Sequence, residues 1–171
     1  MLLALGVGLA AEVIPEPDSG AALAWSHECN DAGSRCVFEK MVEFNSSDGA
    51  ERGGIIVVYD KPSRQPEFIV VVVPSGLPSG SEVVIGFLDS LQKDGKWTLV
   101  PVKDSLVGLP LSDCDKSSCQ ARVHSRIPDG PDLFEEFQRH RFASVLYKRG
   151  GKSETFLVPL AGLITELASV K

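Results

Sequence analysis

The chain has 171 residues, of which 43% are apolar and 23% are charged, and its formal net charge is −6. This length suits one domain, and the apolar fraction is enough for a hydrophobic core, which argues against a disordered chain. An acidic surface repels phosphate backbones, so the composition also argues against general nucleic-acid binding.

The first eleven residues, MLLALGVGLAA, carry no charge and predict the apolar segment of a secretory signal peptide. They are too few to span a membrane, which takes about 20 apolar residues. Ala10 and Ala11 are small residues that suit a cleavage site, although no Lys or Arg precedes Arg35, so the usual basic leader is missing. The alternative is an N-terminus that frays or docks on the core. Residues 12–24, with Pro15 and Pro17, are then a linker, and residues 25–171 form the domain.

Short β-prone runs alternate with turn residues from Trp25 to Ile127. The predicted strands are residues 37–44, 55–59, 68–73, 81–89, 97–103 and 120–127. Two of them, Ile55–Tyr59 and Phe68–Val73, are unbroken runs that are typical of central strands covered on both faces. They are joined by residues 60–66, which predicts an antiparallel hairpin. The Asp94-Gly95 pair predicts a second hairpin turn.

The C-terminal part adds two predicted helices and one more strand pair. Pro131 and the acidic residues after it predict a helix over residues 131–137. Strands over 142–148 and 155–158 turn at Gly150-Gly151, and an apolar stripe predicts a terminal helix over 160–167. Eight or nine strands with frequent turns predict a single all-β domain, an antiparallel β-sandwich or barrel with one or two short helices near its C-terminus.

Four cysteines form two close pairs in the sequence, Cys29 with Cys36 and Cys114 with Cys119. Neither spacing matches a zinc knuckle or a C-x-x-C redox motif. Four cysteines allow three connectivities, and the clustering favours two local disulfides, which persist only in an oxidising compartment such as the periplasm. The alternative is four unrelated thiols in a cytosolic domain.

No catalytic, metal or cofactor motif stands out in the sequence. The stretch Gly76–Gly80 places Ser79 one position away from the serine of a G-x-S-x-G elbow. His27, His124 and His140 are scattered, and none has a nearby acidic residue in sequence to orient it, which lowers the expectation of a hydrolase with a dispersed active site. No zincin, Walker or dinucleotide-binding motif is present. We therefore expect a protein that is not an enzyme and that needs neither a metal nor a cofactor.

One charge cluster is a candidate binding site. Five cations fall within fourteen residues that contain no acid: Arg139, Arg141, Lys148, Arg149 and Lys152. On an acidic protein such a patch could dock an anionic partner, whereas the simpler interpretation is the solvated side of a hairpin. A third hypothesis is a small-ligand or glycan site built on an exposed aromatic ring. Trp97, Tyr59 and Tyr147 are the candidates for that ring, although core packing is the simpler explanation for them, and also for Trp25.

The order of these features resembles the invasion-associated locus B family, exported proteins of Gram-negative bacteria. Trp25-x3-Cys29 with Cys36 soon after is similar to the start of the family domain. The apolar strand 68–73 leads into a Pro/Gly-rich corner at 74–80, as in the family, although the corner is shorter here. Cys114 and Cys119, followed by Gln120-Ala121, occupy the place of the second bridge, and residues 158–163 resemble the closing segment.

The resemblance covers roughly residues 25–167 and implies a disulfide-bearing β-sandwich in the periplasm or at the outer membrane. It implies a role in host-cell invasion or in the envelope, through binding to an unidentified envelope or host-surface partner. Peripheral association with the outer membrane is compatible with this, without a transmembrane span. The family has no catalytic residues to carry over.

Overall fold

The computed structural model describes residues 24–170 except 79, 94 and 128–129. The predicted signal segment, almost all of the predicted linker and Asp94 of the predicted turn therefore lie outside the described residues. No helix in the described part of the chain is long and apolar enough to cross a membrane.

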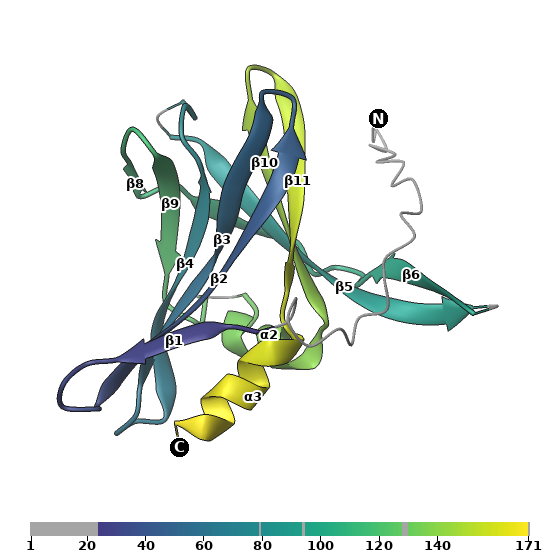
Figure 1. The fold of residues 1–171 in the computed structure, drawn as a ribbon. Coiled ribbons are helices and arrows are strands. Elements are labelled where there is room, and N and C mark those ends of the chain that lie inside the picture. Colours follow the sequence, from purple (N-terminus) through teal and green to yellow (C-terminus); the bar gives the residue numbers. More distant parts are fainter. Residues whose placement is uncertain (1–23, 79, 94, 128–129, 171) are drawn as a thin grey trace.

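Two antiparallel sheets form the body of the domain (Figure 1). The first sheet has the strand order β1-β2-β3-β4-β9-β8, with β1 Ser26–Cys29, β2 Arg35–Ser46, β3 Gly49–Asp60, β4 Gln65–Pro74, β9 Ser118–Val123 and β8 Asp113–Cys114. The second has the order β11-β10-β5-β6, with β11 Lys152–Pro159, β10 Phe142–Arg149, β5 Glu82–Lys93 and β6 Lys96–Pro101. A short strand, β7 Val107–Pro110, also pairs with β5. Within residues 24–170 as described, the all-β fold with two sheets, two short helices and two local disulfides confirms the predicted fold class.

The core lies between the two sheets. From the first sheet, Ile55, Val57, Ile69 and Val71 are fully buried there, because alternate side chains of β3 and β4 point inward. These are the two strands predicted to be central, and both lie in the interior of the first sheet. Side chains of the opposite parity, such as Val70, are buried but lie outside the core cluster.

Strand boundaries differ from the predicted ones where pairing outweighs local composition. β2 and β3 run to twelve residues each, because they pair without interruption from Arg35↔Asp60 to Ser46↔Gly49. β9 ends at Val123, four residues before the predicted end. Three short strands, β1, β7 and β8, were not predicted. Each has only two to four residues and is defined by its partner strand more than by its own composition.

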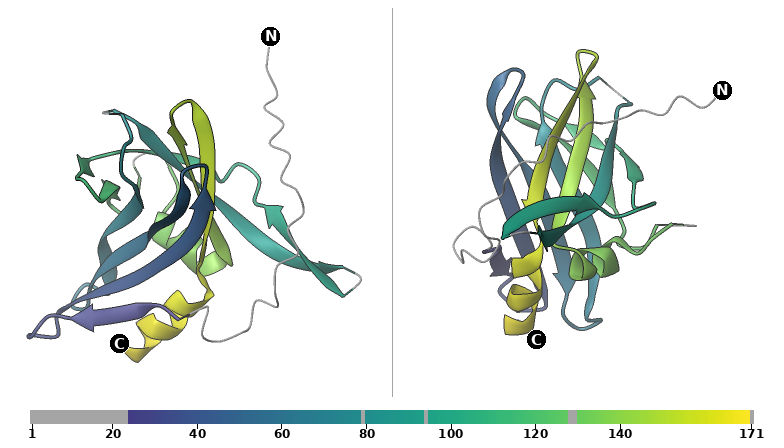
Figure 2. Two further views of the ribbon diagram at one scale, coloured as in Figure 1. Left: turned by 45° about the horizontal axis from the view of Figure 1, so that its top comes forward. Right: turned by 90° about the vertical axis from the view of Figure 1, so that its right-hand side faces the viewer.

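Two helices, α2 Leu133–Arg139 and α3 Ala161–Ser169, lie at the same end of the sandwich (Figures 1 and 2). α2 begins after Asp132, whose carboxylate accepts hydrogen bonds from the backbone N–H groups of Phe134 and Glu135. α3 follows the predicted apolar stripe and buries Leu163 and Leu167 against the core. The helices therefore cover one open end of the sandwich core.

A hairpin projects from the second sheet. β10 pairs with β5 only over residues 84–88, so residues 89–93 of β5 have β6 as their only partner strand in the described part of the chain. We call residues 89–101 the β5–β6 arm; it points away from the sandwich in Figure 1. An isolated two-stranded ribbon is only marginally stable in water. The arm therefore depends on its root, where β5 joins the sheet.

Candidate functional site

Both predicted disulfides are present. Cys29 bonds to Cys36 and Cys114 bonds to Cys119, and the described residues contain no free cysteine. Each bridge joins residues that face each other on adjacent strands, β1 with β2 and β8 with β9. In each pair one member is fully buried, Cys36 or Cys119. The bridges therefore hold the two outermost strands of the first sheet to its interior.

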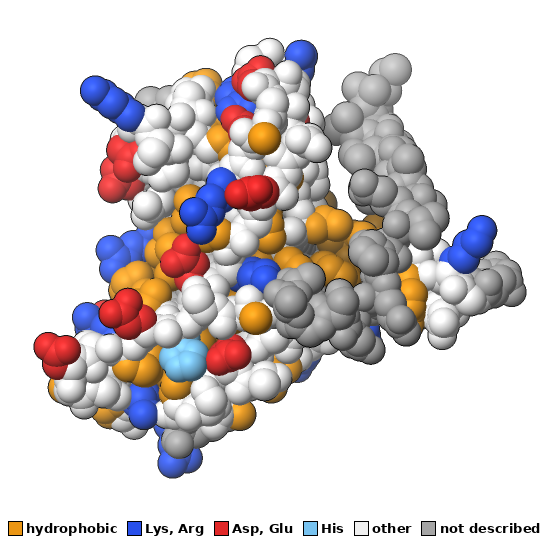
Figure 3. Space-filling view, in the orientation of Figure 1, with side chains coloured by type: hydrophobic (Ala, Val, Ile, Leu, Met, Phe, Trp, Pro, Cys, Tyr) orange, Lys and Arg blue, Asp and Glu red, His pale blue; other side chains and the backbone are white. Residues whose placement is uncertain are grey.

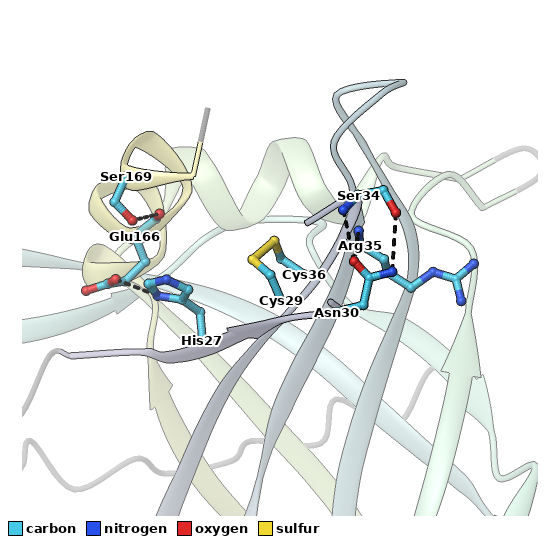
Figure 4. The surroundings of a disulfide bond; sticks show 8 residues. All are labelled: His27, Cys29, Asn30, Ser34, Arg35, Cys36, Glu166 and Ser169. Carbon is cyan, nitrogen blue, oxygen red and sulfur yellow. Dashed lines mark hydrogen bonds and ion pairs between the residues drawn. A yellow bond between two sulfur atoms is a disulfide. The ribbon is translucent and has the colours of Figure 1, made fainter. Parts of the chain in front are cut away.

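The first disulfide closes a tight loop beside α3 (Figure 4). Within the loop, the Asn30 side-chain oxygen accepts hydrogen bonds from the backbone N–H groups of Ser34 and Arg35, at 2.9 and 3.1 Å. On the other side of the bridge, His27 Nδ1 lies 3.0 Å from Glu166 Oε2, which ties β1 to α3. A surface groove of about 470 Å³ runs along β1, lined by the disulfide, His27 and residues of β2.

A second groove, of about 320 Å³, lies between the β3–β4 turn and the two helices. Tyr59, Phe134 and Leu167 supply apolar surface, and Arg64 and Gln138 supply polar groups. Arg64 has φ +56°, in the left-handed region that a residue other than glycine seldom adopts. Asp132 and Glu135 add two carboxylates to the lining. The groove therefore combines aromatic carbon with amide and guanidinium donors and carboxylate acceptors, which can hold a small polar ligand.

Two of the histidines have acidic partners that the sequence analysis missed. His140 lies between Asp89 and Glu136, with each ring nitrogen 3.1 Å from a carboxylate oxygen. His27 pairs with Glu166, as described above. Asp89 and Glu166 are distant in sequence, so they do not bear on the expectation, which concerned acidic residues nearby in sequence. That expectation was wrong for one pair, His140 with Glu136, which lies one helical turn before it. A helical i, i+4 spacing could have revealed the last pair.

The two histidines differ in their access to the grooves. His27 lines the groove along β1, with its Nδ1 against Glu166, whereas His140 has a carboxylate at each ring nitrogen. His140 lines neither of the two grooves. His124 contacts the backbone oxygen of Glu67, at 3.1 Å. In the described residues, no three His, Cys, Asp or Glu side chains gather as metal ligands would.

The predicted basic patch is divided by the fold. Arg139 pairs with Glu135 and Glu136 on its own helix, and Arg149 turns into the space between the hairpins. Arg141 directly precedes β10, whereas Lys148 of β10 and Lys152 of β11 lie at the opposite end of the β10–β11 hairpin. The structure thus pairs two of the five cations, Arg139 and Arg149, with acids and separates the other three between the two ends of this hairpin. Whether they bind an anionic partner stays a prediction.

Arg149 forms the best-connected polar cluster of the described residues. Its two terminal nitrogens lie 2.6 and 2.9 Å from the two oxygens of Glu51, and Tyr147 donates to Glu51 at 3.2 Å. Hydrogen bonds from Arg149 lower the pKa of Glu51 below its ordinary value. Burial, followed by the charge of Glu51, raises the pKa of Tyr147 well above its ordinary value. The cluster clamps the β2–β3 hairpin to the β10–β11 hairpin.

The aromatic candidates for a ligand platform also have defined places. Trp25, Tyr59 and Tyr147 are buried in the core, as expected, and the Trp25 ring nitrogen donates to the Pro159 carbonyl at 3.1 Å. Trp97 is not in the core cluster; it is half-buried on the arm, so its expected role as a core anchor was wrong. The Arg141 guanidinium lies over its ring, 5.8 Å from the ring centre. No family model, curated protein or solved structure matches the chain.

Proposed function

We propose that this chain is an exported, non-catalytic binding protein of the cell envelope, as its resemblance to invasion-associated locus B proteins implies. It acts in the periplasm or at the outer membrane, and it recognises its partner through its surface. The observation that carries the proposal is the pair of cross-strand disulfides with no cysteine left free in the described residues. Such bridges form and persist in oxidising compartments, outside the cytoplasm.

The surface supports a binding role better than a catalytic one. The polar clusters around Arg149 and His140 join secondary-structure elements, and their members line neither groove. Exposed apolar side chains and cations are instead spread over strands and hairpins. A partner can bind such surfaces through complementary shape, apolar contacts and charge, without a catalytic group.

The proposal is tested by trapping the thiols of the full chain in living Gram-negative cells. Cells are quenched in acid, free thiols are alkylated, and the soluble cytoplasmic and extracytoplasmic fractions are separated. We expect an oxidised protein outside the cytoplasm, with Cys29 linked to Cys36 and Cys114 linked to Cys119. A reduced protein confined to the cytoplasm would overturn the proposal.

The groove beside the helices favours a second candidate function, the binding of a small polar ligand such as a sugar. Tyr59 and Phe134 offer aromatic surface, and the guanidinium of Arg64 is exposed at its edge. Saturation-transfer NMR with a panel of mono- and disaccharides tests this. If a sugar binds in this groove, its ring protons should give saturation-transfer signals, and Arg64→Ala should reduce them. Signals that Arg64→Ala leaves unchanged, or no signals at all, would rule out this function.

A further inference from the structure

The outer face of the second sheet carries several large apolar side chains among polar ones. Side chains alternate along a strand, and residues paired across two antiparallel strands share a face. Val83, Ile85 and Phe87 of β5 belong to the core, so the alternate residues and their pairing partners point outward. The outward set has the apolar members Val84, Leu88, Trp97, Leu99, Phe142, Leu146 and Leu157 and the polar members Ser90, Gln92, Ser144, Ser153 and Thr155. We call it the outer face.

Two members of this face are well sheltered without being part of the core. Leu88 and Phe142 pair with each other and are almost fully buried, yet neither belongs to the core cluster. Leu106 lies against the same face, because a Cβ placed on Gly86 would come within 2.9 Å of the Leu106 side chain. Leu106 itself is 75% exposed. Figure 3 shows hydrophobic side chains gathered on the surface at the base of the arm. Antiparallel sandwiches usually carry polar residues on their outer faces.

Cations border the outer face. Arg141 lies over the Trp97 ring, and Lys148 is on the same face as Leu146, two residues further along β10. Lys103, two residues after β6, is exposed, and Lys96 is exposed beside Trp97 but on the opposite face of the arm. Within the described part of the chain none of these four has a carboxylate partner for its side chain.

Two acids must be set against these cations: Glu82, an outward residue at the start of β5, and Asp104, which is exposed in the loop after β6. The border is thus more basic than acidic on a chain whose net charge is −6.

We propose that the outer face of the second sheet docks on an anionic lipid surface. This rests on the proposed function and names the surface and the partner class through which the exported protein acts. Apolar side chains and an amphipathic Trp enter the interfacial layer, while Arg141 and Lys148 meet anionic headgroups. A second copy is the less favourable occupant, because a two-fold contact would bring together two copies of a face whose border is more basic than acidic.

Tryptophan fluorescence gives a local readout. In the full chain with Trp25→Phe, Trp97 is the remaining tryptophan. We expect its emission to shift to shorter wavelength when vesicles of phosphatidylcholine mixed with phosphatidylglycerol are added, and brominated acyl chains to quench it. Vesicles of phosphatidylcholine alone should produce neither effect, and added salt should weaken both. The proposal would be overturned if the chain bound both kinds of vesicle equally well. It would also be overturned if the anionic vesicles left the Trp97 emission unchanged.

Vesicle co-sedimentation of matched variants tests the face itself. Leu106→Ser and the double change Arg141→Glu with Lys148→Glu should each weaken binding, the double change by about tenfold or more. The controls are Ile164→Ser and Arg52→Glu, which alter an exposed apolar side chain on α3 and an exposed cation on β3. They should bind like the unchanged chain. Leu106 is so exposed that Leu106→Ser should not affect folding, which thermal unfolding checks.

The outcomes separate this proposal from the proposed function. Residues 1–23 are identical in all variants, so binding that the face variants leave intact would belong to another part of the chain and overturn the proposal. A dimer in solution that the face variants convert to monomer would show that a second copy covers the face, which also overturns it. An oxidised protein outside the cytoplasm that ignores anionic vesicles would refute lipid docking and leave export standing.

Discussion

Arg149 and Glu51 meet end to end across the two long hairpins, with both carboxylate oxygens accepting hydrogen bonds from the guanidinium, at 2.6 and 2.9 Å. Their side chains are only 14% and 16% exposed. The pair is 98 residues apart in sequence, so it forms only when the β2–β3 and β10–β11 hairpins are in register. A bidentate, mostly buried pair of this kind fixes orientation as well as adding stability.

We expect Glu51→Gln to lower the free energy of unfolding by about 1–3 kcal/mol, because it leaves the mostly buried guanidinium without its charged partner. Urea unfolding of the oxidised protein at neutral pH measures the change. Glu43→Gln is the matched control, since Glu43 is exposed on the same hairpin and its side chain has no bonding partner among the described residues. Equal losses for the two variants would contradict the role assigned to the pair.

The same pair predicts an acid-sensitive part of the stability. Hydrogen bonds from Arg149 hold the pKa of Glu51 in the folded protein below its ordinary value of 4.5. A lowered folded-state pKa means that this contribution is fully present above the ordinary value and is lost as pH falls through the lowered one. The stability difference between the unchanged chain and Glu51→Gln should therefore shrink on acidification below that value. A difference that stays constant or grows would refute this.

Each disulfide should stabilise the fold by about 2–2.5 kcal/mol, the chain-entropy estimate for loops this short. Replacing both Cys29 and Cys36 by Ser, or both Cys114 and Cys119, should lower the unfolding free energy by roughly this amount. Calorimetry in the absence of reductant gives the values. The unchanged chain with reductant serves as the control. Its unfolding free energy should fall by about as much as that of a third variant, in which all four cysteines are replaced by Ser. Reductant without effect would contradict the assigned bridges.

Gly53 has no room for a side chain. A Cβ placed there would lie 2.5 Å from the Phe156 ring and 3.0 Å from the Val72 carbonyl oxygen, so the facing sheets would have to move apart. We expect Gly53→Ala to destabilise the protein by about 1–3 kcal/mol. Gly108→Ala is the matched control, because the nearest atoms there belong to the flexible end of Glu82. Thermal unfolding compares the two variants. A Gly53→Ala protein that is as stable as the Gly108→Ala protein would show that the facing sheets can accommodate the added methyl group, which would contradict this prediction.

Local sequence patterns were enough to predict the central part of this fold. The runs at 55–59 and 68–73 became β3 and β4 because unbroken β-branched residues suit the interior of a sheet. The close cysteine spacings led to both disulfides, since short loops bring partners together without help from the rest of the chain. Such features depend on neighbours within a few residues, which a single sequence displays.

Features that depend on distant partners could not be predicted in this way. The five cations between Arg139 and Lys152 are close in sequence, but Arg139 lies on α2, and the β10–β11 hairpin separates Arg141 from Lys148 and Lys152. Arg149 pairs with Glu51 on another hairpin. Trp97 was expected to be a core residue. However, β5 extends beyond the end of its pairing with β10, so the part of β6 that carries Trp97 pairs with a projecting segment of β5. Strand length and pairing register, which decide both outcomes, are set by the whole sheet.

The central claim is that the domain works outside the cytoplasm, and protease accessibility in cells tests it most directly. Intact cells, cells with a permeabilised outer membrane and fully lysed cells are treated in parallel, with an unfolded, reduced sample to show that the protease can cut the chain. The account predicts cleavage in intact cells, for a surface location, or after permeabilisation of the outer membrane, for a periplasmic one. A protein that is protected in both and cut only after complete lysis would be cytoplasmic, and that result would contradict the account.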